Sequence, residues 1–430
     1  MRQGDSTHPR AFGPRPGRGW NAVLRNGRFL DPETGLVVEG DMRIENGEIA
    51  EIGEIGAVAR TGASPEDGPG GYVETDLGGT TVTPGLIDAH FHAYAAGMGG
   101  IMMATRTTSF VVINGVNRLS AALRRGFTTV RDVAGGDIGL QQAIERGMVD
   151  APHYLFSGRV LSQTGGHGDV RPAEHDLHAG CDHTHEVVDG IDALRTAVRE
   201  RLRTGSHVIK IMASGGVISP TDPLTVPQYS AEEIAVVCEE AGRRGRYVAA
   251  HAYSAEAVIH AVTNGVRSVE HGNLIDVEAA RVIADNGAFL VPTLAAYDAM
   301  RRRGEEAGLS PVGREKNAEV LGAGQQAIRL AREAGVRVGF GTDLMGDLED
   351  EQLRGIELQA QVLEPLELLR SMTVENAALI QDPGRGNLAV GSAADLVAFR
   401  EDPLEDVSVL WDQTRPRVVI QGGAVVWDER

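Results

Sequence analysis

The sequence predicts an α/β protein, a (β/α)8 TIM barrel with a small β-sandwich domain built from both termini. Short apolar runs alternate with helix-like segments through the middle of the chain, which is the pattern of repeated βα units. Both ends instead carry period-2 patterns with Asn-Gly or Gly-Gly turns. The 430 residues exceed the roughly 250 typical of one barrel, so a second structural unit is expected.

The order of segments along the chain defines three regions. Residues 1–19 are rich in Gly, Pro and Arg, and we expect them to be disordered. Residues 20–82 and 384–430 read as short strands with turns, so we expect them to pair into one composite β-sandwich domain. Residues 83–383 would then form the barrel.

Eight short apolar segments are candidate barrel strands, and most are followed by a helix-like segment. After the fourth strand, for instance, Ser230 and Glu233 have the spacing of a capping box that starts a helix. The expected strands are 82–92, 127–133, 153–161, 207–213, 247–253, 268–272, 288–294 and 337–343.

Composition narrows the classes of function. A net charge of -19 argues against nucleic acid or an anionic membrane as partner, because like charges repel within about a Debye length. No run of about 18 apolar residues predicts a membrane span. Two cysteines cannot form a disulfide framework, and the first residues show no apolar segment typical of a secretory signal. We therefore expect a cytoplasmic protein with a small-molecule substrate.

The strongest local signal is the pair His90 and His92 at the end of the first expected barrel strand. Alternate residues of a strand point to the same side, so both imidazoles would face the barrel interior. A pair placed in this way can bind one metal ion.

Four further polar residues end strands that otherwise read as apolar: Lys210, His251, His271 and Asp343. Barrel active sites form at the C-terminal ends of the strands. A lone His there could be a core residue and a lone Asp a helix cap, but we expect the six residues from five strands to converge on one point.

The segments VTPGLIDAHFH, IKIMASGG, AHAYS, SVEHGN and GTD together resemble the motifs of the amidohydrolase superfamily, from about residue 20 to 430. Within it, TGGHGD, KIMASGGVISPTDP, RYVAAHAYS and EHGNLID followed by AFLVPTL resemble the imidazolonepropionase-like branch, which contains Xaa-Pro dipeptidases and ochratoxin-hydrolysing amidases. Resembling proteins form larger homo-oligomers, so we expect one here.

The resemblance implies a binuclear centre with two divalent ions, for which we expect Zn²⁺. It implies that His90 and His92 bind the more buried ion, that His251 and His271 bind the more exposed one, and that Asp343 is a ligand to the buried ion. Lys210 would bridge both ions after carboxylation by CO2. An ammonium between two dications would be repelled, whereas a neutral amine can capture CO2 to give an anionic carbamate.

Two such ions share a water, lower its pKa from 15.7 toward about 7, and polarise the scissile carbonyl. Asp343 is the candidate to take the proton from this hydroxide and return it to the leaving amine. By resemblance, His167 and Tyr253 lie where family members contact the substrate's carboxylate or carbonyl oxygen. The roles of the other histidines in the loop 167–185 are left open, and their spacing matches no usual zinc pattern.

The leading hypothesis is hydrolysis of a peptide-like amide with a free carboxylate, such as an Xaa-Pro dipeptide, an N-acyl amino acid or an ochratoxin-like amide. Cyclic amidases and urea or arylamide hydrolases of the same superfamily remain alternatives. A ring deaminase is disfavoured, because deaminases carry a Glu where this chain has Ser254 and Lys210 favours two ions. A non-catalytic scaffold would have lost its ligands, whereas this chain keeps all six.

Overall fold

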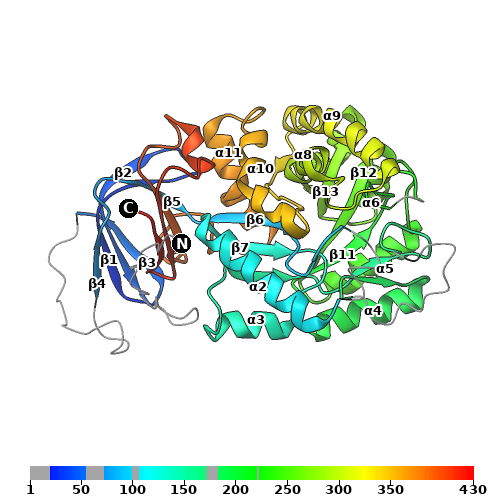
Figure 1. Ribbon diagram of the computed structural model, residues 1–430, viewed down its shortest axis with the longest axis horizontal. Coiled ribbons are helices and arrows are strands. Elements are labelled where there is room, and N and C mark those ends of the chain that lie inside the picture. Colours follow the sequence, from blue (N-terminus) through cyan, green and yellow to red (C-terminus); the bar gives the residue numbers. More distant parts are fainter. Residues whose placement is uncertain (1–19, 55–71, 99–105, 170, 172–182, 220–221) are drawn as a thin grey trace, which may run out of the picture.

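A computed structural model describes residues 20–54, 72–98, 106–169, 171, 183–219 and 222–430. Figure 1 shows strands from both ends of the chain side by side on the left, and a ring of helices around parallel strands on the right. The expected disordered segment 1–19 and most of the His-rich loop, 172–182, lie outside the described residues.

The two ends of the chain form one eight-stranded sheet. β16 pairs antiparallel with β5, and β5 pairs parallel with β1, so β5 joins the C-terminal strands to the N-terminal ones. Buried apolar side chains from both ends pack in one cluster, which explains why the ends associate. The order is β18 (Ala424–Asp428), β17 (Arg417–Gln421), β16 (Leu396–Phe399), β5 (Thr81–Pro84), β1 (Ala22–Leu30), β2 (Val37–Glu45) and β3 (Glu48–Gly53), with β4 (Val73–Asp76) paired to β1. Pairing of the two ends is thus seen in a sheet, while a two-layered sandwich stays a prediction.

Parallel strands form the second part of the molecule, in two hydrogen-bonded sheets. One contains β6 (Leu86–Phe91), β7 (Phe127–Asp132) and β8 (His153–Phe156); the other contains β10 (His185–Val187), β9 (Val160–Ser162), β11 (Val208–Met212), β12 (Tyr247–Ser254), β13 (Ser268–Leu274), β14 (Phe289–Val291) and β15 (Arg337–Val338). Backbone bonds link the sheets at both edges: His207 N donates to Phe156 O at 2.9 Å, and Ala89 N donates to Phe340 O at 2.9 Å. The arrangement is barrel-like, with strands near all eight expected positions.

Two expected strands are interrupted. The predicted strand 82–92 is in fact β5, in the terminal sheet, followed by β6, in the barrel. They are separated by Gly85, where a Cβ would lie only 2.0 Å from Thr128 Oγ1, so the close approach at this crossing requires glycine. The predicted strand 153–161 divides into β8 and β9. Periodicity alone predicted each as one strand because both halves are apolar.

Helices cover the outside of the barrel, and their sequences explain their positions. In α2, the buried side chains recur at helical spacing, including Val111, Leu119 and Ala122. α5 begins with the expected capping box between Ser230 and Glu233. The described helices are α2 (Thr108–Arg124), α3 (Ile138–Glu145), α4 (Ile191–Arg203), α5 (Ala231–Gly242), α6 (Ala255–Thr263), α7 (Val277–Asp285), α8 (Leu294–Arg303), α9 (Pro311–Glu333), α10 (Gln352–Gln359), α11 (Pro365–Met372) and α12 (Val374–Leu379), with 3-10 turns η1 (Gly346–Glu351) and η2 (Val407–Leu410).

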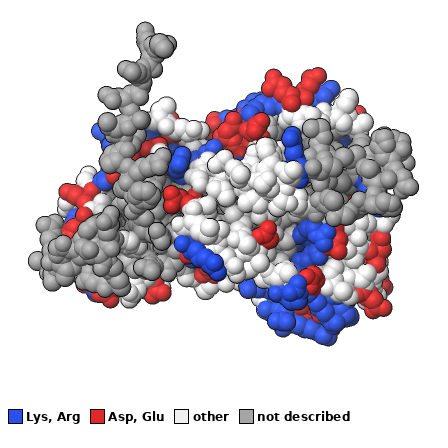
Figure 2. Space-filling view, turned by 60° about the horizontal axis from the view of Figure 1, so that its bottom comes forward, with Lys and Arg blue, Asp and Glu red and all other residues white. Residues whose placement is uncertain are grey.

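Surface charge is unevenly distributed. Figure 2 shows acidic and basic residues interspersed on one face, with a concentrated basic area at its lower edge. A chain whose net charge is -19 therefore still exposes a basic surface. Among the described residues, no helix is both long and apolar enough to cross a bilayer.

Candidate active site

His90, near the C-terminal end of β6, and His92, directly after it, face one cluster. Glu270 Oε2 lies 2.7 Å from His90 Nδ1, so His90 presents Nε2 to Asp343 Oδ1, 3.2 Å away. His92 Nε2 lies 2.7 Å from the same oxygen. The two rings meet edge to face with centroids 5.0 Å apart. As expected for alternate strand positions, both imidazoles point to one side.

His251 in β12 and His271 in β13 complete the imidazole cluster. Their ring centroids are 4.5 Å apart, and His271 lies 5.0 Å from His90. All of these rings are buried, and burial is the main cause that lowers the pKa of His92 to about 4 and the pKa values of His251 and His271 well below their usual range. The imidazoles of His92, His251 and His271 are therefore neutral at pH 7, which is the state that binds metal ions.

Asp343 and Lys210 add one carboxylate and one amine to the cluster. Donor atoms of His90, His271 and Asp343 lie within 4.8 Å of one another, the single group of this kind among the described residues. Burial opposes ionisation of Asp343, but the neighbouring histidines, His90 first, hold its pKa well below the usual range. Burial lowers the pKa of Lys210 to about 8, against the opposing pull of the carboxylates of Glu270 and Asp343. The structure thus brings all six expected ligands into one neighbourhood.

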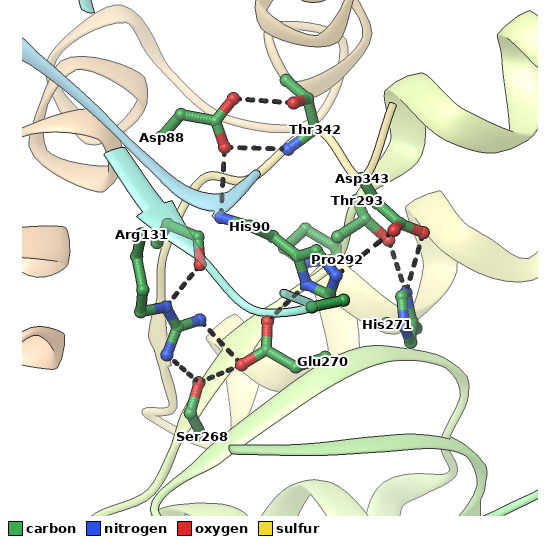
Figure 3. Close-up of polar contacts among 12 residues, drawn as sticks. Asp88, His90, Arg131, Ser268, Glu270, His271, Pro292, Thr293, Thr342 and Asp343 are labelled. Carbon is green, nitrogen blue, oxygen red and sulfur yellow. Dashed lines mark hydrogen bonds and ion pairs between the residues drawn. The ribbon is translucent and has the colours of Figure 1, made fainter. Parts of the chain in front are cut away.

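A fully buried ion pair beneath the histidines escaped sequence reasoning. Figure 3 shows Glu270 between His90 and Arg131, whose Nη2 lies 2.7 Å from Glu270 Oε1. Burial disfavours the charged carboxyl, but Arg131 and His90 hold the pKa of Glu270 well below its usual range. A carboxylate on the far nitrogen of a histidine fixes its tautomer and orientation. The sequence does contain a signal for this ion pair: Arg131 in FTTVRDV and Glu270 in SVEHG are charged residues inside predicted strands that are otherwise apolar.

His167 and Tyr253, the expected substrate contacts, both pack against the imidazole cluster. The His167 ring stacks on His251 with centroids 4.4 Å apart and an interplanar angle of 19°. Its Nδ1 lies 3.4 Å from Asp222 Oδ2. A Cβ on Gly216 would lie only 2.0 Å from the same ring, so glycine is required beneath it. Tyr253 stacks on the neighbouring histidine of β13 at 5.1 Å.

Two hydroxyl groups beside His271 also escaped sequence reasoning. Thr293 Oγ1 and Tyr297 Oη lie 2.8 Å and 2.7 Å from His271 Nδ1. Tyr297 Oη is also 2.9 Å from Tyr253 Oη. The segment LVPTLAAYDAM reads as a strand followed by a helix, and nothing in it marks these hydroxyls as functional.

Comparisons with known proteins agree with this geometry. The amidohydrolase family model matches residues 81–426. The ochratoxinase of Aspergillus niger is 33% identical over 326 residues, which cover 70% of this chain and 66% of the ochratoxinase, so the match spans just under two thirds of that relative. A crystal structure of a prolidase complexed with N-methylphosphonate-L-proline has a TM-score of 0.88 at 40% identity, covering 95% of this chain and 100% of the prolidase. A Xaa-Pro dipeptidase with methionine bound in its active site has a TM-score of 0.81 at 27% identity, covering 95% and 100%.

Proposed function

We propose that this chain, which belongs to the amidohydrolase family, is a metal-dependent hydrolase of the amide bond in a small substrate with a free carboxylate. The observation that carries the proposal is the meeting of four imidazoles, one carboxylate and one buried lysine at the C-terminal ends of five parallel strands. The similar prolidase and ochratoxinase support a linear amide, either an Xaa-Pro dipeptide or an N-acyl amino acid.

The donor set fits two divalent ions. Neutral imidazole and carboxylate are ligands that zinc takes in catalytic sites. His92 Nδ1 is buried and has no hydrogen-bond partner, and His90 is held so that Nε2 faces Asp343. His90 and His92 would hold one ion with Asp343, His251 and His271 the other, and carboxylated Lys210 both. When bound, such ions would act as Lewis acids on the scissile carbonyl and lower the pKa of a water toward neutrality.

The protein's own groups supply the proton transfers. Asp343 begins the reaction ionised, because the surrounding histidines overcome the cost of its burial. Its Oδ1 faces His90 and His92, while Oδ2 lies 3.7 Å from His271 Nδ1 and is the less engaged oxygen. We assign to Oδ2 the transfer of the nucleophile's proton to the leaving nitrogen.

The substrate would be held by the aromatic groups around the histidines. The rings of His167 and Tyr253 lie 4.4 Å and 4.8 Å from the ring of His251, and we assign them to the substrate's carboxylate and carbonyl oxygen. An apolar cluster that includes Met98, Val217 and Leu344 adjoins Tyr253. We therefore expect an apolar residue or acyl group on the carbonyl side of the scissile bond.

A substrate panel tests the proposal. Protein reconstituted with zinc and bicarbonate is assayed with Leu-Pro, Met-Pro, Asp-Pro, N-acyl phenylalanines, a hydantoin and a phenylurea, and released amines are quantified. Turnover of Leu-Pro, Met-Pro or the N-acyl amino acids above Asp-Pro is the expected result. Exclusive turnover of the hydantoin or the phenylurea would assign the site to a cyclic amidase or urea hydrolase instead.

A matched variant separates chemistry from folding. Lys210→Ala should lower the rate by orders of magnitude while the far-ultraviolet circular dichroism stays unchanged, because the lysine lies inside an already closed strand arrangement. Wild-type activity in this variant would remove Lys210 from the mechanism.

A further inference from the structure

Thr293 places its hydroxyl in the site instead of capping its helix. It occupies the N-cap of α8, where threonine normally accepts a hydrogen bond from the first helical turn. No such bond forms, and the backbone is left-handed with φ of +49°, a conformation that is strained for a β-branched residue. The hydroxyl instead lies 2.8 Å from His271 Nδ1. Thr293 therefore combines a missing cap bond and a strained backbone with a hydroxyl contact to His271. This combination points to a role for Thr293 and the residues around it in the site.

Tyr297, one turn into α8, connects three groups at this corner. Its side chain is fully buried, and its Oη lies 2.7 Å from His271 Nδ1, 2.9 Å from Tyr253 Oη and 3.2 Å from Thr293 Oγ1. A tyrosine hydroxyl has an ordinary pKa of about 10, so each of these hydroxyls keeps its proton at neutral pH. Three neighbours therefore share one hydroxyl that has a single proton to donate.

The protons in this group can be placed by counting donors and acceptors. If His271 binds an ion through Nε2, its Nδ1 carries a hydrogen and can only donate. Tyr297 Oη, the nearest acceptor at 2.7 Å, receives this bond. The proton of Tyr297 then needs another acceptor. Thr293 Oγ1 itself donates to Tyr297 Oη at 3.2 Å, so the acceptor is Tyr253 Oη at 2.9 Å.

We propose that Tyr297 is a positioning residue: it accepts from His271 and donates to Tyr253, and so leaves the hydroxyl proton of Tyr253 free to donate to the oxygen of the substrate. The inference rests on the proposed function, because it takes His271 as a ligand and Tyr253 as a substrate contact. Tyr253 is oriented for such a donation, since its ring is packed against both His251 and His271 at 4.8 Å and 5.1 Å. The alternative order, in which Tyr253 donates to Tyr297, would leave the substrate without this donor.

The test compares Tyr297→Phe, Tyr253→Phe and the double variant in the zinc-loaded protein. The probe is N-methylphosphonate-L-proline, whose dissociation constant is measured by calorimetry beside kcat, KM and zinc content. Tyr253→Phe should lower kcat about 100-fold by removing a donor to the developing oxyanion. Tyr297→Phe should lower kcat and weaken the probe about tenfold, with KM nearly unchanged and two zinc ions retained. The double variant should be no worse than Tyr253→Phe, because Tyr297 acts through it.

Tyr229→Phe is the matched control for loss of a buried tyrosine hydroxyl. Its hydroxyl donates to Val188 O at 3.0 Å, and this variant should keep wild-type kinetics and probe affinity. Wild-type values in Tyr297→Phe, additive losses in the double variant, or loss of zinc from Tyr297→Phe would each overturn the inference. If the wild-type protein neither binds the probe nor hydrolyses any substrate of the panel, the proposed function fails first and the inference falls with it.

Discussion

Lys210 can be tested for carboxylation without interference, because the chain contains only two lysines, Lys210 and Lys316, among its 41 basic residues. Capture of CO2 needs the neutral amine. Burial lowers the pKa of Lys210 from 10.5 to about 8, so about 9% of it is neutral at pH 7, against about 0.03% for a lysine with the ordinary pKa. The environment of the strand thus raises the reactive fraction about 300-fold. Below pH 8 the neutral fraction rises with pH, about tenfold per pH unit.

The assay is ¹³C NMR of protein reconstituted with zinc and ¹³C-bicarbonate. One carbamate resonance per chain is expected in the wild type and in Lys316→Ala, and none in Lys210→Ala. Lys316 is a suitable control because its Nζ donates to the carbonyls of Gly216, Ser219 and Asp222 at 3.0, 2.7 and 2.6 Å, so its three N–H bonds are already engaged, although burial lowers its pKa. The α-amino group is the same in all three samples. A resonance that survives in Lys210→Ala, or its absence from zinc-loaded wild type, would refute the reasoning.

Three further outcomes follow from the geometry. Gly216→Ala places a Cβ 2.0 Å from the His167 ring and should lower kcat/KM about 100-fold; Gly322→Ala, whose Cβ meets nothing within 4 Å, should match wild-type kinetics. Glu270→Gln leaves a buried guanidinium uncompensated, so denaturant unfolding of the zinc-free protein should show a loss of about 3–5 kcal/mol, and unchanged stability would contradict the buried ion pair. Because the folded pKa of His92 is about 4 and the unfolded one 6.5, the unfolded state binds more protons between these values. Protonation of His92 should therefore lower the free energy of unfolding of the zinc-free protein by about 3 kcal/mol as the pH drops from 6.5 to 4. A free energy of unfolding that does not change over this range would contradict the lowered pKa of His92.

The proximity of the six expected ligands could be predicted from sequence because their positions obey local rules. His90 and His92 are two residues apart on one strand, so periodicity alone places both imidazoles on one side. Lys210, His251 and His271 stand out as polar residues at the ends of apolar runs. Once the runs are recognised as neighbouring parallel strands, their ends must meet. The family matched by residues 81–426 and the contacts among these side chains agree with that reasoning.

The residues that orient these groups could not be found in the same way, because they act across large separations in sequence. Arg131 and Glu270 lie 139 positions apart, and their pairing depends on how the strands fill the barrel interior. Tyr297 lies on a helix, where an aromatic side chain usually indicates core packing. Its hydroxyl reaches His271 because of the backbone turn before α8, and sequence periodicity does not predict that turn. Sequence periodicity describes which face a residue occupies, and it does not describe which partner it meets there.

The left-handed backbone of Thr293 belongs to a pattern shared by three consecutive strands. His271 in β13, Thr293 after β14 and Asp343 after β15 all have left-handed backbones, with φ of +75°, +49° and +57°. Such conformations cost about 1–3 kcal/mol each for residues other than glycine, so together they cost about 3–9 kcal/mol. Net domain stabilities are only about 5–15 kcal/mol, so strain of this size must be offset by packing elsewhere, here by the closed ring of buried strands beneath it. Glycine would relieve the strain at each position, but it would remove an imidazole, a hydroxyl or a carboxylate from the cluster. The backbone is therefore left-handed where these side chains are needed, and two of the three residues, His271 and Thr293, contact Tyr297.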